Sequence, residues 1–123
     1  MQGALGLIEC IGFTTAMAAA DAATKAAVVT VLGSERVIGV GKAVSVVVKL
    51  QGDVASVQAA VSAGQAAAER VGKVVSVHVI PRPHQELERL ILSGETRASL
   101  VGSPTAPGGE APPKTKENRK QNK

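Results

Sequence analysis

The chain has 123 residues, of which 45% are apolar and one, Phe13, is aromatic, so we expect a single domain with a core of Val, Ala, Leu and Ile. The formal net charge is +4, and residues 111–123 hold five of the 14 basic and one of the 10 acidic residues, which leaves nine of each elsewhere. A neutral body with one aromatic ring argues against a nucleic-acid-binding surface, which needs a basic face and stacking groups.

Cys10 is the only cysteine, which excludes an intrachain disulfide and a paired-cysteine metal site. No apolar run approaches the roughly 20 residues that span a bilayer, and the N-terminus has no basic region typical of a signal peptide. We therefore expect an intracellular protein that does not enter a membrane.

The chain opens with a strand and a helix. ALGLIEC and the residues after it predict a short buried strand that Gly12 ends, and the Ala-rich segment 14–27 predicts a helix with Thr14 or Thr15 as its cap. Asp21 and Lys25 lie one turn apart and can form an exposed ion pair. The expected apolar stripe of this helix comprises Phe13, Met17, Ala20, Thr24 and Ala27.

Two further strands are expected over 28–33 and 42–50, with the glycine-containing segment SERVIGVG, residues 34–41, as the loop between them. Asp53 can accept the free N–H groups of the first turn of a second helix that ends at Gly72. The apolar seam of that helix comprises Val54, Val57, Val61, Gly64, Ala68 and Val71.

Residues 73–80 predict the fourth strand, with Ser76 and His78 on one face. The other face is expected to carry Val75, Val77 and Val79. After Pro81, Arg82 and Pro83, residues 84–92 predict a short amphipathic helix whose inward residues are Leu87, Leu90 and Ile91.

This order predicts an α+β fold of the split βαβ, ferredoxin-like kind, in which helices cover one face of a four-stranded antiparallel sheet and a short C-terminal helix follows. Residues 1–92 form the expected domain. Residues 93–123 are rich in Pro, Gly and Lys and have little to bury, so a disordered, solubilising tail is expected.

Catalytic chemistry is poorly supported by the sequence. The spacing in GSERVIGVGKA fails the phosphate-loop pattern at Arg36 and Ala43, and it fails the dinucleotide fingerprint at Val44. His78 and His84 have no recognisable acidic partner and do not share the helix face that zinc-binding histidines at i, i+4 use. We therefore expect no enzyme activity, no metal and no cofactor.

The segments GALGLIECIGF, AAADAATKAA, GDV, AGQAAAERVG and VVSVHVIPRPH together resemble the single-domain, hexamer-forming shell proteins of bacterial microcompartments. The resemblance covers residues 3–92. It implies a non-enzymatic tile: a homohexamer that packs edge to edge with other shell proteins around enclosed enzymes in the cytoplasm, with an axial pore for small polar or anionic metabolites.

The resemblance also assigns residues. Lys25 and Arg82 match the family's edge lysine and edge arginine, and His84 would lie at the same seam between hexamers. Pro81 and Pro83 fix φ, which would hold Arg82 on a stiff projection. Val28 stands where many relatives carry Asn beside the edge lysine.

SERVIGVG matches the family's pore loop, so the resemblance places pore residues at Ile38, Gly39, Val40, Gly41 and Lys42. The chain is about four residues longer than the common pattern between Gly33 and Gly52, so Arg36 or Lys42 could reach the channel. Because Cys10 lies in the first strand, no pore iron–sulfur cluster is expected.

Two other classes remain as alternatives. A ligand-sensing regulatory domain of the nitrogen-regulator type could use the same fold, but it needs a long mobile loop with polar groups. An RNA-binding module would need aromatic residues on the sheet.

Overall fold

A computed structural model describes residues 2–40 and 43–92. The elements of these two ranges are β1 (Ala4–Ile11), α1 (Phe13–Ala26), β2 (Thr30–Val40), β3 (Ala43–Gly52), α2 (Val54–Val71), β4 (Val74–Ile80) and α3 (Leu87–Leu92). The predicted order of strands and helices is confirmed. The predicted tail, 93–123, lies outside the described residues.

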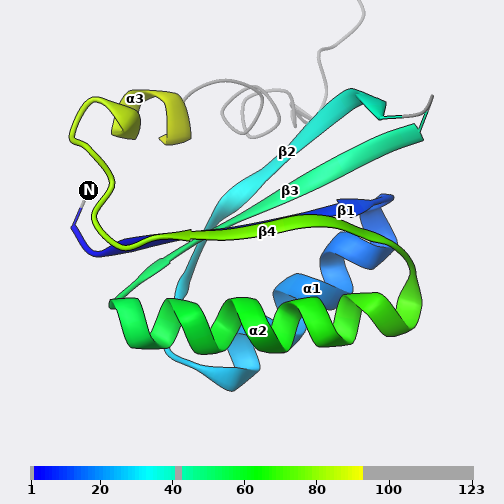
Figure 1. Ribbon diagram of the computed structural model, residues 1–123, viewed down its shortest axis with the longest axis horizontal. Helices are drawn as coiled ribbons and strands as arrows, with labels where there is room; N and C mark the ends of the chain where they lie inside the picture. The colour runs from blue at the N-terminus through cyan, green and yellow to red at the C-terminus, as the bar shows by residue number, and fades with distance from the viewer. Residues whose placement is uncertain (1, 41–42, 93–123) are drawn as a thin grey trace, which may run out of the picture.

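The strands pair antiparallel in the order β2-β3-β1-β4, with α1 and α2 on one face of the sheet and α3 on the other (Figure 1). The two strands that follow the helices, β2 and β4, therefore form the two edges, as the crossovers of a split βαβ unit require. The predicted fold class is confirmed. We call the side under α1 and α2 the helix-covered face, and the side that carries α3 the open face.

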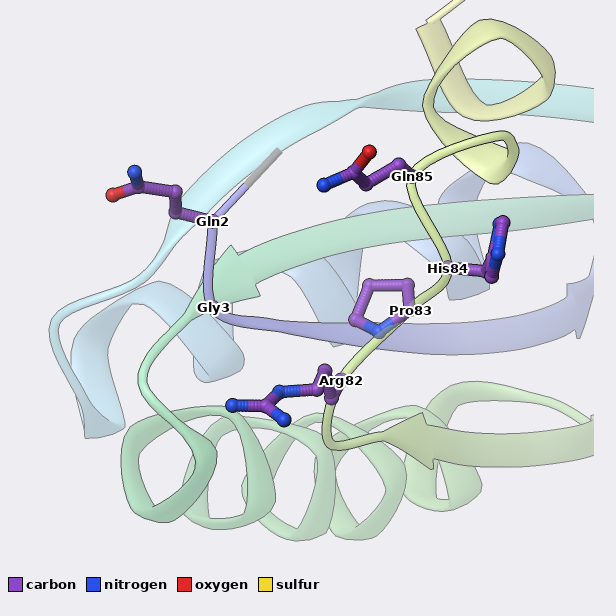
Figure 2. Close-up of a pocket in the computed structure, with 6 residues that line it drawn as sticks. All are labelled: Gln2, Gly3, Arg82, Pro83, His84 and Gln85. Carbon is purple, nitrogen blue, oxygen red and sulfur yellow. The ribbon is translucent and has the colours of Figure 1, made fainter.

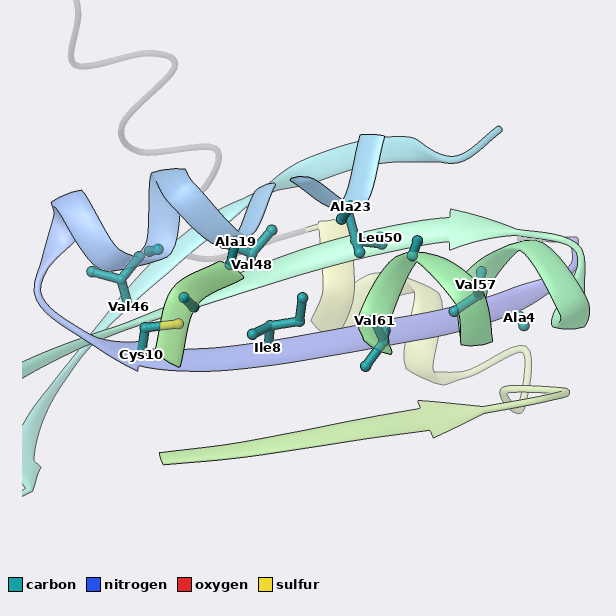
Figure 3. Packing of buried hydrophobic residues seen from close by; sticks show 13 residues of the cluster. Ala4, Ile8, Cys10, Ala19, Ala23, Val46, Val48, Leu50, Val57 and Val61 are labelled. Carbon is teal, nitrogen blue, oxygen red and sulfur yellow. The ribbon is translucent and has the colours of Figure 1, made fainter. Parts of the chain in front are cut away.

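Alternation along the strands sends small aliphatic side chains to the helix-covered face (Figure 3). The core cluster takes Ala4, Ile8 and Cys10 from β1, Val46, Val48 and Leu50 from β3, and Val57, Ala60, Val61 and Ala68 from α2. Its α1 members are Ala16, Ala19 and Ala23. With alanines on α1 and Gly64 on α2, the two helix backbones can approach closely.

The predicted stripe of α1 is wrong at Phe13, Met17 and Thr24, all of which are exposed. Phe13 is 63% exposed and Met17 is 36% exposed, whereas Thr15 and the three alanines above are buried. The helix is turned so that its smallest side chains face the sheet, because Gly64 of α2 leaves room for a backbone and not for a large side chain.

The predicted cap of α1 is also wrong. Gly12 occupies the cap position with φ 84° and no side-chain hydrogen bond closes the first turn. A positive φ is readily available only to glycine, so the geometry of this turn favours glycine at position 12. Thr15 is buried instead against Gly72, where an added Cβ would meet its side chain.

The predicted loop over 34–41 is wrong for most of its length. β2 continues through Val40, with Val37 opposite Ser45 and Ile38 opposite Val44, and the last pair joins Val40 to Ala43. The β-branched residues favour an extended chain, and the pairing continues across two register shifts, between Val31 and Gly33 and between Ile38 and Val40. Only Gly41 and Lys42, which lie outside the described residues, separate the strands.

The predicted inward face of β4 is wrong at one position. The pairing shifts between Glu9 and Cys10, so that Cys10 lies opposite Val74. Val74 therefore packs against the core together with Val77 and Val79, and Val75 is turned outward. A bulge adds one residue to one strand, and this addition cannot be recognised from alternation alone.

Candidate functional site

Residues 81–85 connect β4 to the turn before α3 and form an exposed projection. Arg82 stands between Pro81 and Pro83, whose rings fix φ, and its side chain is exposed. Within the described ranges Arg82 makes no hydrogen bond or ion pair, so its guanidinium donors are open to a ligand or another chain. Arginine offers a planar fork of donors, which suits carbonyl or oxyanion acceptors.

His84 organises the turn before α3. Its backbone carbonyl accepts a hydrogen bond from the N–H of Leu87 at 2.9 Å, and its Nδ1 accepts one from the N–H of Glu86 at 3.2 Å. This geometry assigns the ring proton to Nε2. The helix thus begins three residues later than predicted, and His84 precedes it.

α3 lies on the open face with Ile91 buried and Leu90 exposed by 72%. The prediction that Leu90 points inward is therefore wrong. A helix of six residues makes fewer than two turns, so few of its side chains can face the sheet.

The end of the sheet beside residues 81–85 also carries the last turn of α1. Leu5 pairs with Ile80, and Gln51 pairs with Thr30, so the start of β1 and the ends of β3 and β4 meet the start of β2 there. Lys25 lies five residues before Thr30. Its Nζ is 2.8 Å from Asp21 Oδ2, which confirms the predicted exposed ion pair.

The tip of the β2–β3 hairpin lies at the opposite end of the sheet, beside the end of β1. The N–H of Gly12 donates to Val44 O at 3.0 Å, and Ile38, opposite Val44, is 85% exposed. Gly39 and Val40 complete β2 there, and Gly41 and Lys42 lie outside the described residues. The two sets of candidate residues are thus separated by the length of β1, eight residues or roughly 26 Å.

The open face carries polar contacts that the sequence reading missed. Glu9 accepts hydrogen bonds from the hydroxyls of Ser45, at 2.8 Å, and Ser76, at 3.3 Å. The Ser45 hydroxyl, fully buried, also lies 3.3 Å from Val37 O. Alternation along each strand places these residues on the same face of the sheet. It does not show that they are neighbours until the strand order and register are known.

Lys49 is the other buried polar group of this face, with 4% exposure. Its Nζ donates to Ile91 O at 2.7 Å and lies 3.7 Å from Glu35 Oε2. The ammonium therefore ties α3 to the sheet.

Cys10 is buried in the core. Burial, and to a lesser degree the charge of Glu9, raises the pKa of its thiol, so the reactive thiolate is disfavoured. His78 lies on the open face opposite Leu7. Within the described ranges, no three His, Cys, Asp or Glu side chains gather closely enough to hold a metal ion.

An open pocket of about 600 Å³ lies between the N-terminal segment and residues 82–85 (Figure 2). Gln2, Gly3, Arg82, Pro83, His84 and Gln85 line it. Arg82 and His84 therefore both border this pocket. None of the helices formed by the described residues is both long and apolar enough to cross a membrane.

Comparison with known protein families gives a match between residues 4–83 and the BMC domain. Among curated proteins, the chain is 50% identical over 93 residues to the bacterial microcompartment shell protein PduA of Citrobacter freundii, covering 76% of this chain and 96% of that protein. It is 51% identical over 93 residues to the carboxysome shell protein CcmK2 of Synechococcus elongatus, covering 74% and 87%.

The bacterial microcompartment shell protein EutM of Escherichia coli is 48% identical over 91 residues, covering 74% of this chain and 90% of that protein. Among solved structures, a microcompartments protein from Desulfitobacterium hafniense matches with a TM-score of 0.56 and 30% identity. The match covers 75% of this chain and 48% of that one, so this chain spans about half the length of that solved protein.

Proposed function

The chain belongs to the BMC domain family, a family of structural and not enzymatic shell proteins of bacterial microcompartments, and we propose that six copies of it form a flat ring-shaped tile. The role in the shell, and with it a place in a cytoplasmic microcompartment, follows from membership of the family. The ring, its axial pore and its edge contacts are the proposal.

The observation that carries the proposal is the separation of the two candidate sites at opposite ends of the sheet. A ring-shaped tile needs one end of each subunit at the axis and the other at the rim. The β2–β3 hairpin supplies a narrow tip at one end, and Lys25 and Arg82 supply cations at the other. Six copies arranged with their tips inward would put Lys25 and Arg82 outward.

The tip would line an axial pore with Ile38, Gly39, Val40, Gly41 and Lys42. Pairing of β2 with β3 up to Val40 and Ala43 supports a stiff pore lining in place of the predicted loop. Six copies of Lys42 would favour anions, so we expect small polar or anionic metabolites to pass through the pore.

The rim would pack against the rims of other tiles, of this chain or of related shell proteins, through Arg82, Lys25 and His84. The Arg82 donors have no partner within the described part of the chain, which supports a contact with backbone carbonyls of a neighbouring tile. The ion pair of Lys25 with Asp21 is exposed and worth about 0.3–0.5 kcal/mol, so Lys25 can exchange this partner for another. Enclosed enzymes are the expected contents of the shell.

No observation favours the ligand-sensing alternative. It needs a long mobile loop between the second and third strands, where the structure has two paired strands.

The test is assembly. Purified protein should have the mass of a hexamer by light scattering coupled to size-exclusion chromatography, and electron micrographs should show sheets or tubes. Arg82→Ala and Lys25→Ala should keep the hexamer and weaken the sheets, whereas Arg70→Ala, at an exposed site in the last turn of α2, should change neither. A monomer or trimer at high concentration would sink the proposal, and collapse of the hexamer in Arg82→Ala would place Arg82 at a different interface.

A further inference from the structure

The pocket beside Arg82 is lined by hydrogen-bond donors. Arg82 contributes a guanidinium, and Gln85 contributes the N–H groups of a carboxamide. Neither of these side chains has a hydrogen-bond or ionic partner among the described residues. None of the six lining residues is acidic. The local chemistry is therefore complementary to an anion.

The lining residues come from two separate stretches of chain, and the side chain of Gln2 points away from Arg82 and Gln85 (Figure 2). Figure 2 shows the side chains of Arg82 and Gln85 reaching from the segment after β4 toward the side where Gln2 and Gly3 lie, whereas the ring of His84 points away. Arg82 and Gln85 thus form one wall, and the N-terminal segment forms the other.

Both walls are held in place without a ligand. Gln51 Nε2 donates to the backbone carbonyl of Gln2 at 2.6 Å, and Gly3 has φ 91° at a site where a Cβ would collide with Gly52 O. Pro81 and Pro83 restrict the other wall. Restricted walls reduce the ordering cost of binding.

The donor set selects the class of ligand. The guanidinium fork can donate two parallel hydrogen bonds to an oxyanion, and the Gln85 amide can donate to another oxygen of the ligand. The pocket volume of about 600 Å³ exceeds the needs of a bare phosphate and leaves room for a small organic group. Glu86 and Asp53, adjacent in sequence to Gln85 and Gly52, do not line the pocket, and the Asp53 carboxylate already accepts hydrogen bonds from Ser56.

We infer that this pocket binds a small phosphate or phosphomonoester through Arg82 and Gln85, and that the bound anion competes with the contacts that Arg82 makes between tiles. The second half of this inference rests on the proposed function, because it takes Arg82 as a rim residue. An anion on Arg82 occupies the donors that a neighbouring tile requires, so a phosphorylated metabolite would loosen the seam.

Binding can be measured by isothermal titration calorimetry on the full chain with inorganic phosphate at constant ionic strength, with chloride and acetate as comparisons. Saturable binding of phosphate is expected, about tenfold weaker in Arg82→Ala and in Arg82→Lys, because lysine keeps the charge and loses the fork. Gln85→Ala should weaken it several-fold, and Arg70→Ala should leave it unchanged. All variants keep the basic residues 111–123, so binding to those residues contributes equally.

Equal phosphate binding by Arg82→Lys, or equal binding of acetate, would overturn the assignment of the pocket. The competition has its own test, since phosphate should delay sheet formation by the natural chain and delay it less in Gln85→Ala, which keeps Arg82 for the seam. Phosphate binding without any delay would overturn the competition alone. If no sheets form under any condition, the proposed tile fails and the calorimetry still decides the pocket.

Discussion

The two faces of the sheet are stabilised by different interactions. On the helix-covered face, alanines, valines and Gly64 fill the space under α1 and α2, and the described strand residues place no buried polar side chain there. On the open face, Ser45 and Lys49 are buried, and each is hydrogen-bonded, one to Glu9 and the other to the backbone of α3.

The contrast shows how a small domain treats an incompletely covered sheet. Two long helices exclude water from one face, so close packing stabilises it. The six-residue α3 covers only part of the other face, where polar groups satisfy one another across strands. Changes of volume should therefore harm the first face most, and loss of hydrogen bonds should harm the second.

Gly64→Leu should have the largest effect. A Cβ at Gly64 would lie 2.9 Å from Ala19 O, a backbone atom of α1, and 2.7 Å from Ile8 Cδ1, so the helices would have to separate. We expect the free energy of unfolding to fall by about 3 kcal/mol or more, measured by chemical denaturation. Ala66→Leu adds a larger side chain at an exposed site of α2 and should change it by less than about 0.5 kcal/mol. Equal effects would show that packing does not control this face.

Lys49→Met should have the next largest effect, and a local one. Methionine keeps the volume but leaves Ile91 O without its donor, so α3 should open more easily by about 1.5–3 kcal/mol. Hydrogen–deuterium exchange should rise in residues 87–92 and stay unchanged in α2. Lys73→Met, at an exposed lysine, is the control. Unchanged exchange in α3 would show that Lys49 does not hold it.

Ser45→Ala should be milder. It removes a fully buried hydroxyl that donates to Glu9, and we expect a loss of about 1–2 kcal/mol in thermal or chemical unfolding. Ser76→Ala removes the exposed hydroxyl on the same carboxylate at 3.3 Å and should lose less than about 0.5 kcal/mol. Comparing the two variants shows whether a buried hydrogen bond to Glu9 stabilises the fold more than an exposed one. Equal losses in the two variants would show that burial makes no difference.

Asp53→Ala should have the smallest effect, a modest decrease in melting temperature at neutral pH. The N–H of Ser56, and then its hydroxyl, lower the pKa of Asp53 below its usual 3.8, so the ionised carboxylate stabilises α2. This contribution is complete above pH 3.8 and is lost as the pH falls through the lower folded-state value.

Melting temperatures of the natural chain and Asp53→Ala should therefore converge in acid. Asp53→Ser keeps a capping oxygen that does not titrate, so its stability relative to Asp53→Ala should not depend on pH. A constant difference between the natural chain and Asp53→Ala down to pH 2 would refute the assignment.

The sequence by itself determined the order of elements, the fold class and the residues that resemble a shell family. Alternating valines, the Asp53 cap and Gly72 mark their elements through local chemistry, and local chemistry is visible along the chain. For the candidate site, the sequence named Arg82, Lys25 and the glycine segment without placing them relative to one another.

Tertiary structure decided how these elements meet. The orientation of α1 depends on the space that Gly64 leaves. The outward direction of Val75 depends on the register shift between β1 and β4. The extension of β2 depends on β3 being available as a partner. The same holds for Gln2 and Arg82, which are 80 positions apart and share a pocket. Such contacts join residues distant in the chain, and their energies arise only when both partners are in place.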